Sequence, residues 1–176
     1  VNSELFMEDD NDEVTISNSA FENATISGNT AGIGTGKGED VVTLNSGAEF
    51  KQGTYVHTGT GNDAINVNGG ANVSHSVIFG GRGDDTISIK AGANFYNYSE
   101  IRGDEGNDKV VIEKGANIST SVIKGGDGED TLNISETIDF SRVKDFEKLE
   151  LGGAENNVET TITAEHVLDM TDSDNR

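Results

Sequence analysis

Five aspartates at a regular spacing are the residues of this chain best suited to chemistry. Asp40, Asp63, Asp85, Asp108 and Asp130 each close a glycine-containing turn, and the steps between them are 23, 22, 23 and 22 residues. Tight turns use Gly because their backbone needs positive φ or a close neighbouring chain. Such turns direct carbonyl oxygens toward the closing carboxylate. This all-oxygen set favours Ca²⁺ over transition metals, and Mg²⁺ gives up its water reluctantly.

Polar residues beside these aspartates are secondary candidates for calcium ligands. Asn62, Asp84 and Asn107 directly precede three of them, and Asp104 and Asp127 lie inside their own turns. In the alternative interpretation, each closing aspartate only caps its turn by a hydrogen bond to the backbone. Repetition favours the cation, because carboxylates stacked about 5 Å apart repel one another unless a cation lies between them. We therefore expect a single row of calcium ions along the turns.

The same period predicts the elements that position the aspartates. Apolar residues stand two and four residues after each one, which indicates a strand with one buried face: Val42, Ile65, Ile87, Val110 and Leu132, then Leu44, Val67, Ile89, Ile112 and Ile134. A small Gly-Ala corner follows, and then a longer strand with two further apolar columns: Phe50, Val73, Phe95, Ile118 and Phe140, then Val56, Ile78, Ile101, Ile123 and Phe146. Such units bury a core only when they are stacked. We predict an all-β, right-handed parallel β-solenoid of about five to six coils with 22–23-residue repeats.

The two ends of the chain depart from the repeat, as the ends of solenoids do. We expect an irregular capping coil over 1–33, the calcium-binding solenoid over 34–151, and a cap or joint to a next domain over 152–176. The segment Asn11–Ile16 matches the turn-to-strand junction without its glycines. Its aspartate, Asp12, lies 28 residues before Asp40, so the first coil carries an insertion. In the last part we predict a strand over 160–163 and a helix over 164–170.

Composition excludes several classes of protein. The chain has 32 acidic and 12 basic residues, a formal net charge of −20, and no Cys. Nucleic-acid binding needs Lys and Arg for the phosphates, so it is not expected. Membrane insertion is not expected either, because no run of 18 apolar residues exists. High charge with low hydrophobicity is also typical of disordered linkers, but the even spacing of the apolar residues argues for a fold.

The turns resemble a known family. The segment Gly80–Ser88, with its glycines, closing Asp85 and following Ile87, is similar to the RTX nonapeptide, Gly-Gly-x-Gly-x-Asp-x-apolar-x, and the likeness recurs from about Gly34 to Ile134. The resemblance implies a parallel β-roll that binds calcium between coils in a bacterial protein exported by type I secretion. The usual roll has two glycine turns per coil, whereas the second corner here lacks an Asp. The C-terminal part resembles joints between repeat blocks in large RTX adhesins.

These observations predict a structural role. We expect a calcium-binding segment of a larger secreted extracellular protein (an adhesin, stalk or surface layer) that folds outside the cell, contacts neighbouring domains and is not an enzyme. His57, His75 and His166 are expected to be surface residues.

The alternative is a non-catalytic, carbohydrate-binding module of a secreted enzyme. For that role Tyr96 and Tyr98 would offer exposed rings, joined by Tyr55 and Phe79. Self-association through strand edges or a surface glycan remain candidate partnerships. Ice binding is rejected, because the third positions of the turns carry mixed charge.

Overall fold

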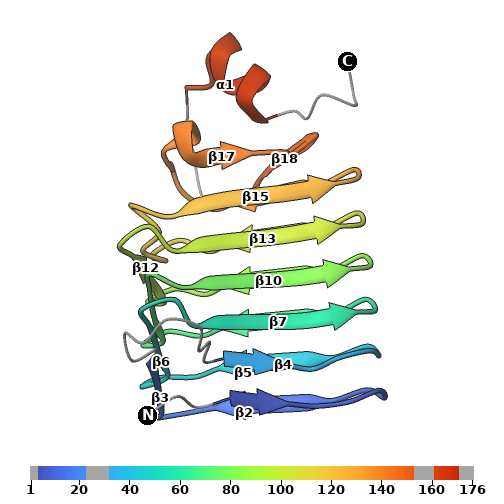
Figure 1. The fold of residues 1–176 in the computed structure, drawn as a ribbon. Helices are drawn as coiled ribbons and strands as arrows, with labels where there is room; N and C mark the ends of the chain where they lie inside the picture. The colour runs from blue at the N-terminus through green and yellow to red at the C-terminus, as the bar shows by residue number, and fades with distance from the viewer. Residues whose placement is uncertain (1–3, 23–31, 153–160, 171–176) are drawn as a thin grey trace.

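A computed structural model describes residues 4–22, 32–152 and 161–170, and over these ranges the chain winds into a parallel β-solenoid of about five turns (Figure 1). Three parallel sheets form its sides. Sheet A contains β1 (Glu4–Phe6), β4 (Gly32–Gly34), β7 (Tyr55–Thr60), β10 (Val77–Arg82), β13 (Glu100–Glu105), β15 (Val122–Asp127) and β17 (Val143–Lys144). Sheet B contains β2 (Glu13–Ile16), β5 (Val41–Leu44), β8 (Ala64–Val67), β11 (Thr86–Ile89), β14 (Lys109–Ile112), β16 (Thr131–Ile134) and β18 (Lys148–Leu151). Sheet C contains β3 (Ala20–Glu22), β6 (Glu49–Lys51), β9 (Asn72–Ser74) and β12 (Asn94–Tyr96).

The core consists of the apolar columns that the repeat predicts. Equivalent residues of successive coils pair directly, as Val42 does with Ile65 in sheet B and Val56 with Ile78 in sheet A. Almost all of the predicted core residues are buried, and Ile118 is half-buried. One assignment was wrong. Val143 and not Phe146 continues the column of Ile123, because β17 pairs with β15 in that register. Phe146 is buried as well, but outside that column.

In the three coils that contain β6, β9 and β12, a bend divides the predicted second, longer strand into two strands. The bend between β6 and β7 contains two residues with left-handed backbone, Gln52 (φ 58°) and Gly53 (φ 81°). The bend between β9 and β10 contains one, His75 (φ 48°). The bend between β12 and β13 again contains two, Asn97 and Tyr98. The alternation of 23- and 22-residue coils is therefore absorbed at this bend, and the turns stay in register.

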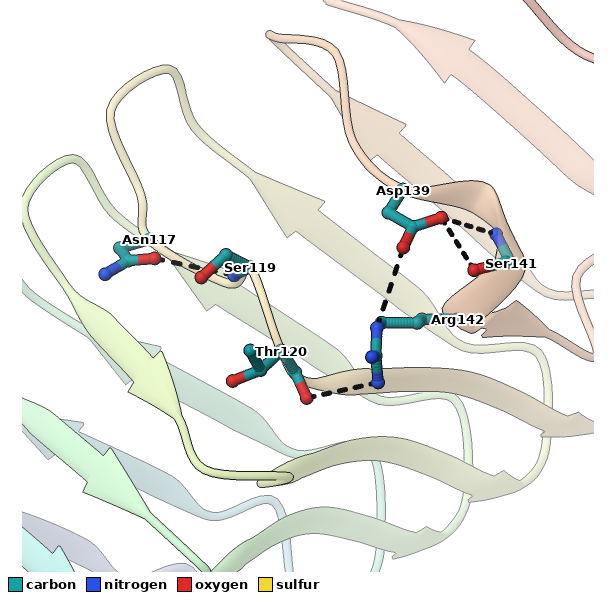
Figure 2. A network of polar contacts seen from close by, with 6 residues as sticks. All are labelled: Asn117, Ser119, Thr120, Asp139, Ser141 and Arg142. Carbon is teal, nitrogen blue, oxygen red and sulfur yellow. Dashed lines mark hydrogen bonds and ion pairs between the residues drawn. The ribbon is translucent and has the colours of Figure 1, made fainter.

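Sheet C ends earlier than sheets A and B. Beyond β12, the next coil adds only an isolated bridge between Asn94 and Asn117. The 3₁₀ helix η1 (Phe140–Arg142) then closes this end (Figure 2). Asp139 caps η1 by accepting the backbone N–H of Ser141, and its other carboxylate oxygen lies 3.6 Å from Nε of Arg142. Arg142 also donates to the carbonyl of Thr120.

The C-terminal segment contains one helix, α1 (Ala164–Met170), which agrees with the predicted range. The predicted strand over 160–163 was wrong where it can be judged, because residues 161–163 have no strand structure and Thr160 lies outside the described residues. Helix α1 packs against η1 and β17, and Met170 accepts the backbone N–H of Phe146. In the described ranges, no helix has the length and apolar character needed to cross a bilayer.

The glycines of the turns let successive coils stack without side chains between them. A Cβ added at Gly61 (φ 140°) would lie 1.5 Å from the carbonyl oxygen of Gly38 in the preceding coil. At the second corner of a later coil the stack is looser, since a Cβ at Gly115 (φ 88°) would meet nothing nearer than 3.8 Å. Both positions have left-handed backbone, but only the turn position is also closed by its neighbour.

This difference predicts unequal costs for the same substitution. Gly115→Ala is expected to lower the free energy of unfolding by about 1–2 kcal/mol, the cost of left-handed backbone for an L-residue. Gly61→Ala is expected to cost clearly more, because the added methyl group must also push two coils apart. Urea unfolding followed by circular dichroism measures both. Equal losses in the two variants would show that the turns do not stack as tightly as the structure has them.

Candidate metal centre

The five predicted aspartates form one continuous ladder along the junction between sheets A and B. The backbone N–H of Asp40 donates to Oδ1 of Asp63, and the same bond at 2.7–2.8 Å links each later aspartate to the next. Asp12 extends the ladder toward the N-terminus, because its backbone N–H donates to Oδ1 of Asp40. All five carboxylates are buried, with at most 4% of the residue exposed. One oxygen of each aspartate thus accepts a backbone N–H, but this N–H belongs to the preceding coil and not to the aspartate's own turn.

The second oxygen of every carboxylate has no hydrogen-bond partner. Oδ2 of each aspartate in the ladder is buried without one. In three coils this oxygen lies against a glycine at the start of the turn. A Cβ at Gly80 would lie 2.0 Å from Oδ2 of Asp85, and Gly103 and Gly125 stand in the same relation to Asp108 and Asp130. A buried, unpaired carboxylate oxygen is costly unless a proton or a cation accompanies it.

The structure adds one residue to the ladder that the prediction missed. Oε2 of Glu147 accepts the backbone N–H of Asp130 at 2.7 Å, and its Oε1 is buried without a partner. The signal was present in the sequence. Leu149 and Leu151 follow Glu147 by two and four residues, which is the offset that follows each aspartate. Glu147 was overlooked because no glycine turn precedes it.

The residues just before the aspartates form a second ladder on the outside of the turns. Oδ1 of Asn62 accepts the backbone N–H of Asp84, Oδ1 of Asp84 accepts that of Asn107, and Oδ1 of Asn107 accepts that of Glu129. These side chains are exposed. Asn62, Asp84 and Asn107 therefore lie apart from the buried Oδ2 atoms, and their Oδ1 atoms are engaged in holding turns together.

Asp104 and Asp127 lie farther back in their turns. Asp104 occupies a position that is glycine in the other turns and keeps a positive φ of 86°. Burial raises its pKa, while Arg102, His57 and Lys124 nearby lower it. Asp127 is exposed and pairs in register with Glu105. The structure thus separates both residues from the buried ladder and places them in a groove along sheet A.

The electrostatics of the ladder follow from its burial. Desolvation raises the pKa of Asp85 and of Asp130 to about 7, and that of Asp108 to about 6. It also raises the pKa of Asp63. The nearby hydroxyl of Thr58 opposes this increase, although that hydroxyl donates its hydrogen bond to the carbonyl of Gly80. Bonds donated by the backbone N–H groups oppose these increases, and neighbouring carboxylates add to them. Near neutral pH, protons or cations must therefore offset the negative charge of this row of carboxylates.

The donor set of the ladder suits calcium when backbone oxygens contribute. Within the described ranges, no group of three or more Asp, Glu, His or Cys side chains could hold a metal ion alone. An ion at the ladder would therefore use one or two carboxylates, and turn carbonyls would complete its shell. Ca²⁺ accepts six to eight oxygen ligands in flexible geometry, whereas Zn²⁺ prefers nitrogen and sulfur. The unpaired Oδ2 atoms and the glycine-rich backbone beside them fit such an ion.

The histidines lie apart from this ladder. His57 is half-buried and stacks on Phe79 with ring centroids 4.2 Å apart, so it is less exposed than expected. Desolvation lowers its pKa. His75 is exposed, as expected for a residue at a bend. His166 is half-buried, and its backbone N–H donates to the hydroxyl of Thr163 at the start of α1.

Comparisons with protein-family models, with curated proteins and with solved structures found no match to this chain. The assignment of a function therefore depends on the geometry of the site itself.

The raised pKa values predict how the free energy of unfolding depends on pH when a chelator removes divalent cations. An unfolded Asp has a pKa of about 3.9, so between about pH 4 and 7 the folded Asp85, Asp108 and Asp130 hold protons that the unfolded chain has released. Stability is then fully present below about pH 4 and is lost as pH rises through about 7. In EDTA, the free energy of unfolding should fall between pH 5 and pH 8, as measured by urea titration.

Other groups do not reverse this expectation. Hydrogen bonds from Lys148, Asn133 and Lys109 lower the pKa of Glu150 to about 2, so it titrates below the window. His57 acts in the opposite sense, but it is one group against several. Asp85→Asn serves as the control and should make the slope shallower. A stability that rises steadily from pH 5 to pH 8 in wild type would contradict the protonated ladder.

Proposed function

We propose that this chain is a calcium-dependent structural segment of a secreted bacterial protein of the RTX type, such as an adhesin, stalk or surface layer. The observation that carries the proposal is the row of buried carboxylate oxygens without hydrogen-bond partners, which continues from Asp40 to Glu147. A solenoid of stacked coils is a scaffold, and the ladder is the part of it that needs a cation.

Repulsion along the ladder explains why calcium would control folding. Neighbouring coils are about 4.8 Å apart, and two charges at this distance repel by roughly 3–4 kcal/mol at an effective dielectric constant of 20. A divalent cation between them turns repulsion into attraction. An ion that binds only the folded state adds about 2.7 kcal/mol per site when its free concentration is a hundred times Kd. Several sites in one row would therefore decide between the folded and unfolded states.

The net charge of −20 acts in the same direction. Where calcium is scarce, as in the cytosol, crowded carboxylates oppose the compact state and leave the chain able to pass through a secretion channel. Outside the cell, calcium at the millimolar level matches the affinity range of extracellular calcium modules. Folding on export would then make secretion hard to reverse, which is the role we propose for the ladder.

We propose no catalytic role for the chain. The carboxylates of the ladder are enclosed, and their backbone bonds belong to the stacking of the coils. The described histidines are engaged or isolated: His57 stacks on Phe79, and His166 bonds to Thr163. The chain would instead serve as a rigid spacer joined to neighbouring domains of a longer protein.

Two neighbouring aspartates give a matched test of the calcium ladder. Asp85 is buried with a free Oδ2, whereas Asp84 is exposed, and Asn at position 84 can still accept the N–H of Asn107. Asp85→Asn and Asp84→Asn change charge and size equally. Asp85→Asn should raise the calcium concentration at half-folding at least tenfold, and Asp84→Asn should leave it within about twofold. Far-UV circular dichroism during calcium titration from EDTA measures both midpoints.

Two outcomes would contradict the proposal. Wild type that keeps an unchanged β spectrum in EDTA at pH 8 would show that the fold needs no cation. Equal effects of the two substitutions would show that the buried oxygens are not the ligands. Magnesium at the same concentration is the ion control, and it should restore little of the spectrum.

A further inference from the structure

The outer face of sheet A carries a long groove with a volume of about 1020 Å³. It runs along the solenoid axis beside the turns, and it contains none of the aspartates of the buried ladder. Residues from β1, β4, β7, β10, β13 and β15 line it. The groove is thus a feature of the stacked coils that the proposed calcium role leaves unused.

One column of outward-facing residues runs along the length of this groove. The parallel register aligns Phe6, Gly34, His57, Phe79, Arg102 and Lys124 across six consecutive strands. The first part of the column is aromatic and the last part is basic. Because each step between strands is about 4.8 Å, the aromatic part from Phe6 to Phe79 extends over about 14 Å.

The aromatic part forms a platform over small residues. The rings of His57 and Phe79 are stacked with centroids 4.2 Å apart, and the ring of Tyr55 lies 6.4 Å from that of Phe79. Phe6 is 61% exposed, and its ring packs over Gly34, where a Cβ would lie 2.9 Å from it. Side chains two residues after each member of the column would fill the groove, but most of these positions are glycine: Gly36, Gly59, Gly81 and Gly126. The result is an open apolar surface whose base is formed by backbone and not by side chains.

Charged groups of both signs surround this platform. Arg82 pairs with Glu105 at 3.0 Å, and Nε of Arg102 donates to Glu100. Carboxylates slightly outnumber cations among the lining residues: Asp104, Glu105, Asp127 and Asp145 against Arg82, Arg102 and Lys124. Such a groove has no excess of positive charge for a polyanion. It offers both donors and acceptors of hydrogen bonds.

We propose that this groove binds a neutral oligosaccharide chain. Pyranose rings present apolar C–H faces that pack on aromatic rings, and their hydroxyl groups both donate to carboxylates and accept from Arg and Lys. A peptide strand fits less well, because strand addition needs an unpaired edge, and the strands that line the groove from β4 to β15 are paired on both sides. A small apolar ligand would need an enclosed pocket, whereas this groove is open along its length.

Native gel electrophoresis of the calcium-loaded chain tests the groove. The gels contain dextran, laminarin or galactomannan as neutral probes, or alginate as the anionic probe. At least one neutral polysaccharide should retard wild type. Phe79→Ala and His57→Ala should each raise the apparent Kd at least tenfold. Tyr98→Ala is the aromatic control. Tyr98 is 71% exposed, as the sequence suggested, but it lies outside the groove, so this variant should bind as wild type does.

Three outcomes would overturn the proposal: no retardation by any neutral polysaccharide, retardation by alginate alone, or wild-type affinity in both groove variants. Far-UV circular dichroism of each variant in calcium verifies that the solenoid is folded. The groove proposal is independent of calcium control, because a chain that keeps its β spectrum in EDTA can be run in EDTA gels. Failure of one proposal is therefore distinguishable from failure of the other.

Discussion

The stacking of like charges at the spacing of a parallel sheet is the constraint on which this structure depends. Each coil contributes one carboxylate to the same line, and the pairing of the strands fixes the coils at this spacing. One oxygen of each carboxylate accepts the backbone N–H of the preceding coil, and the other has no partner. The ladder therefore holds the coils together through its hydrogen bonds and repels them through its charge. Protonation of the carboxylates, or a cation beside them, would shift this balance toward the stacked state.

The turns are held from both directions. In the turns that end at Asp40, Asp85, Asp108 and Asp130, two consecutive N–H groups donate to side chains of opposite neighbours. The N–H of Asp84 donates back to Asn62, while the N–H of Asp85 donates forward to Asp108. The outer ladder alternates Asn62, Asp84 and Asn107, so neutral and charged acceptors alternate and outer like charges are kept apart. These bonds satisfy backbone donors that a tight turn would otherwise leave to water.

The outer face of sheet A is the part of the solenoid that stacking leaves available for binding. Inward positions are used entirely by the core, and the turns by the two ladders. Outward positions on sheet A are free to vary between coils, and here they run from aromatic to basic along one column. The solenoid can thus carry a surface on sheet A that is separate from the buried carboxylates of the turns.

Local, repeated signals were sufficient for much of this protein. The same offsets from every aspartate predicted the core columns and the stack of carboxylates, because each coil must bury the same face. Contacts between coils decided the rest. The bends at Gln52 and His75 set the lengths of the coils, the register of β17 placed Val143 in the column expected for Phe146, and the pairing of β7 with β10 brought His57 onto Phe79. The state of each carboxylate oxygen was also decided there, because a hydrogen bond to the next coil exists only once both coils are stacked.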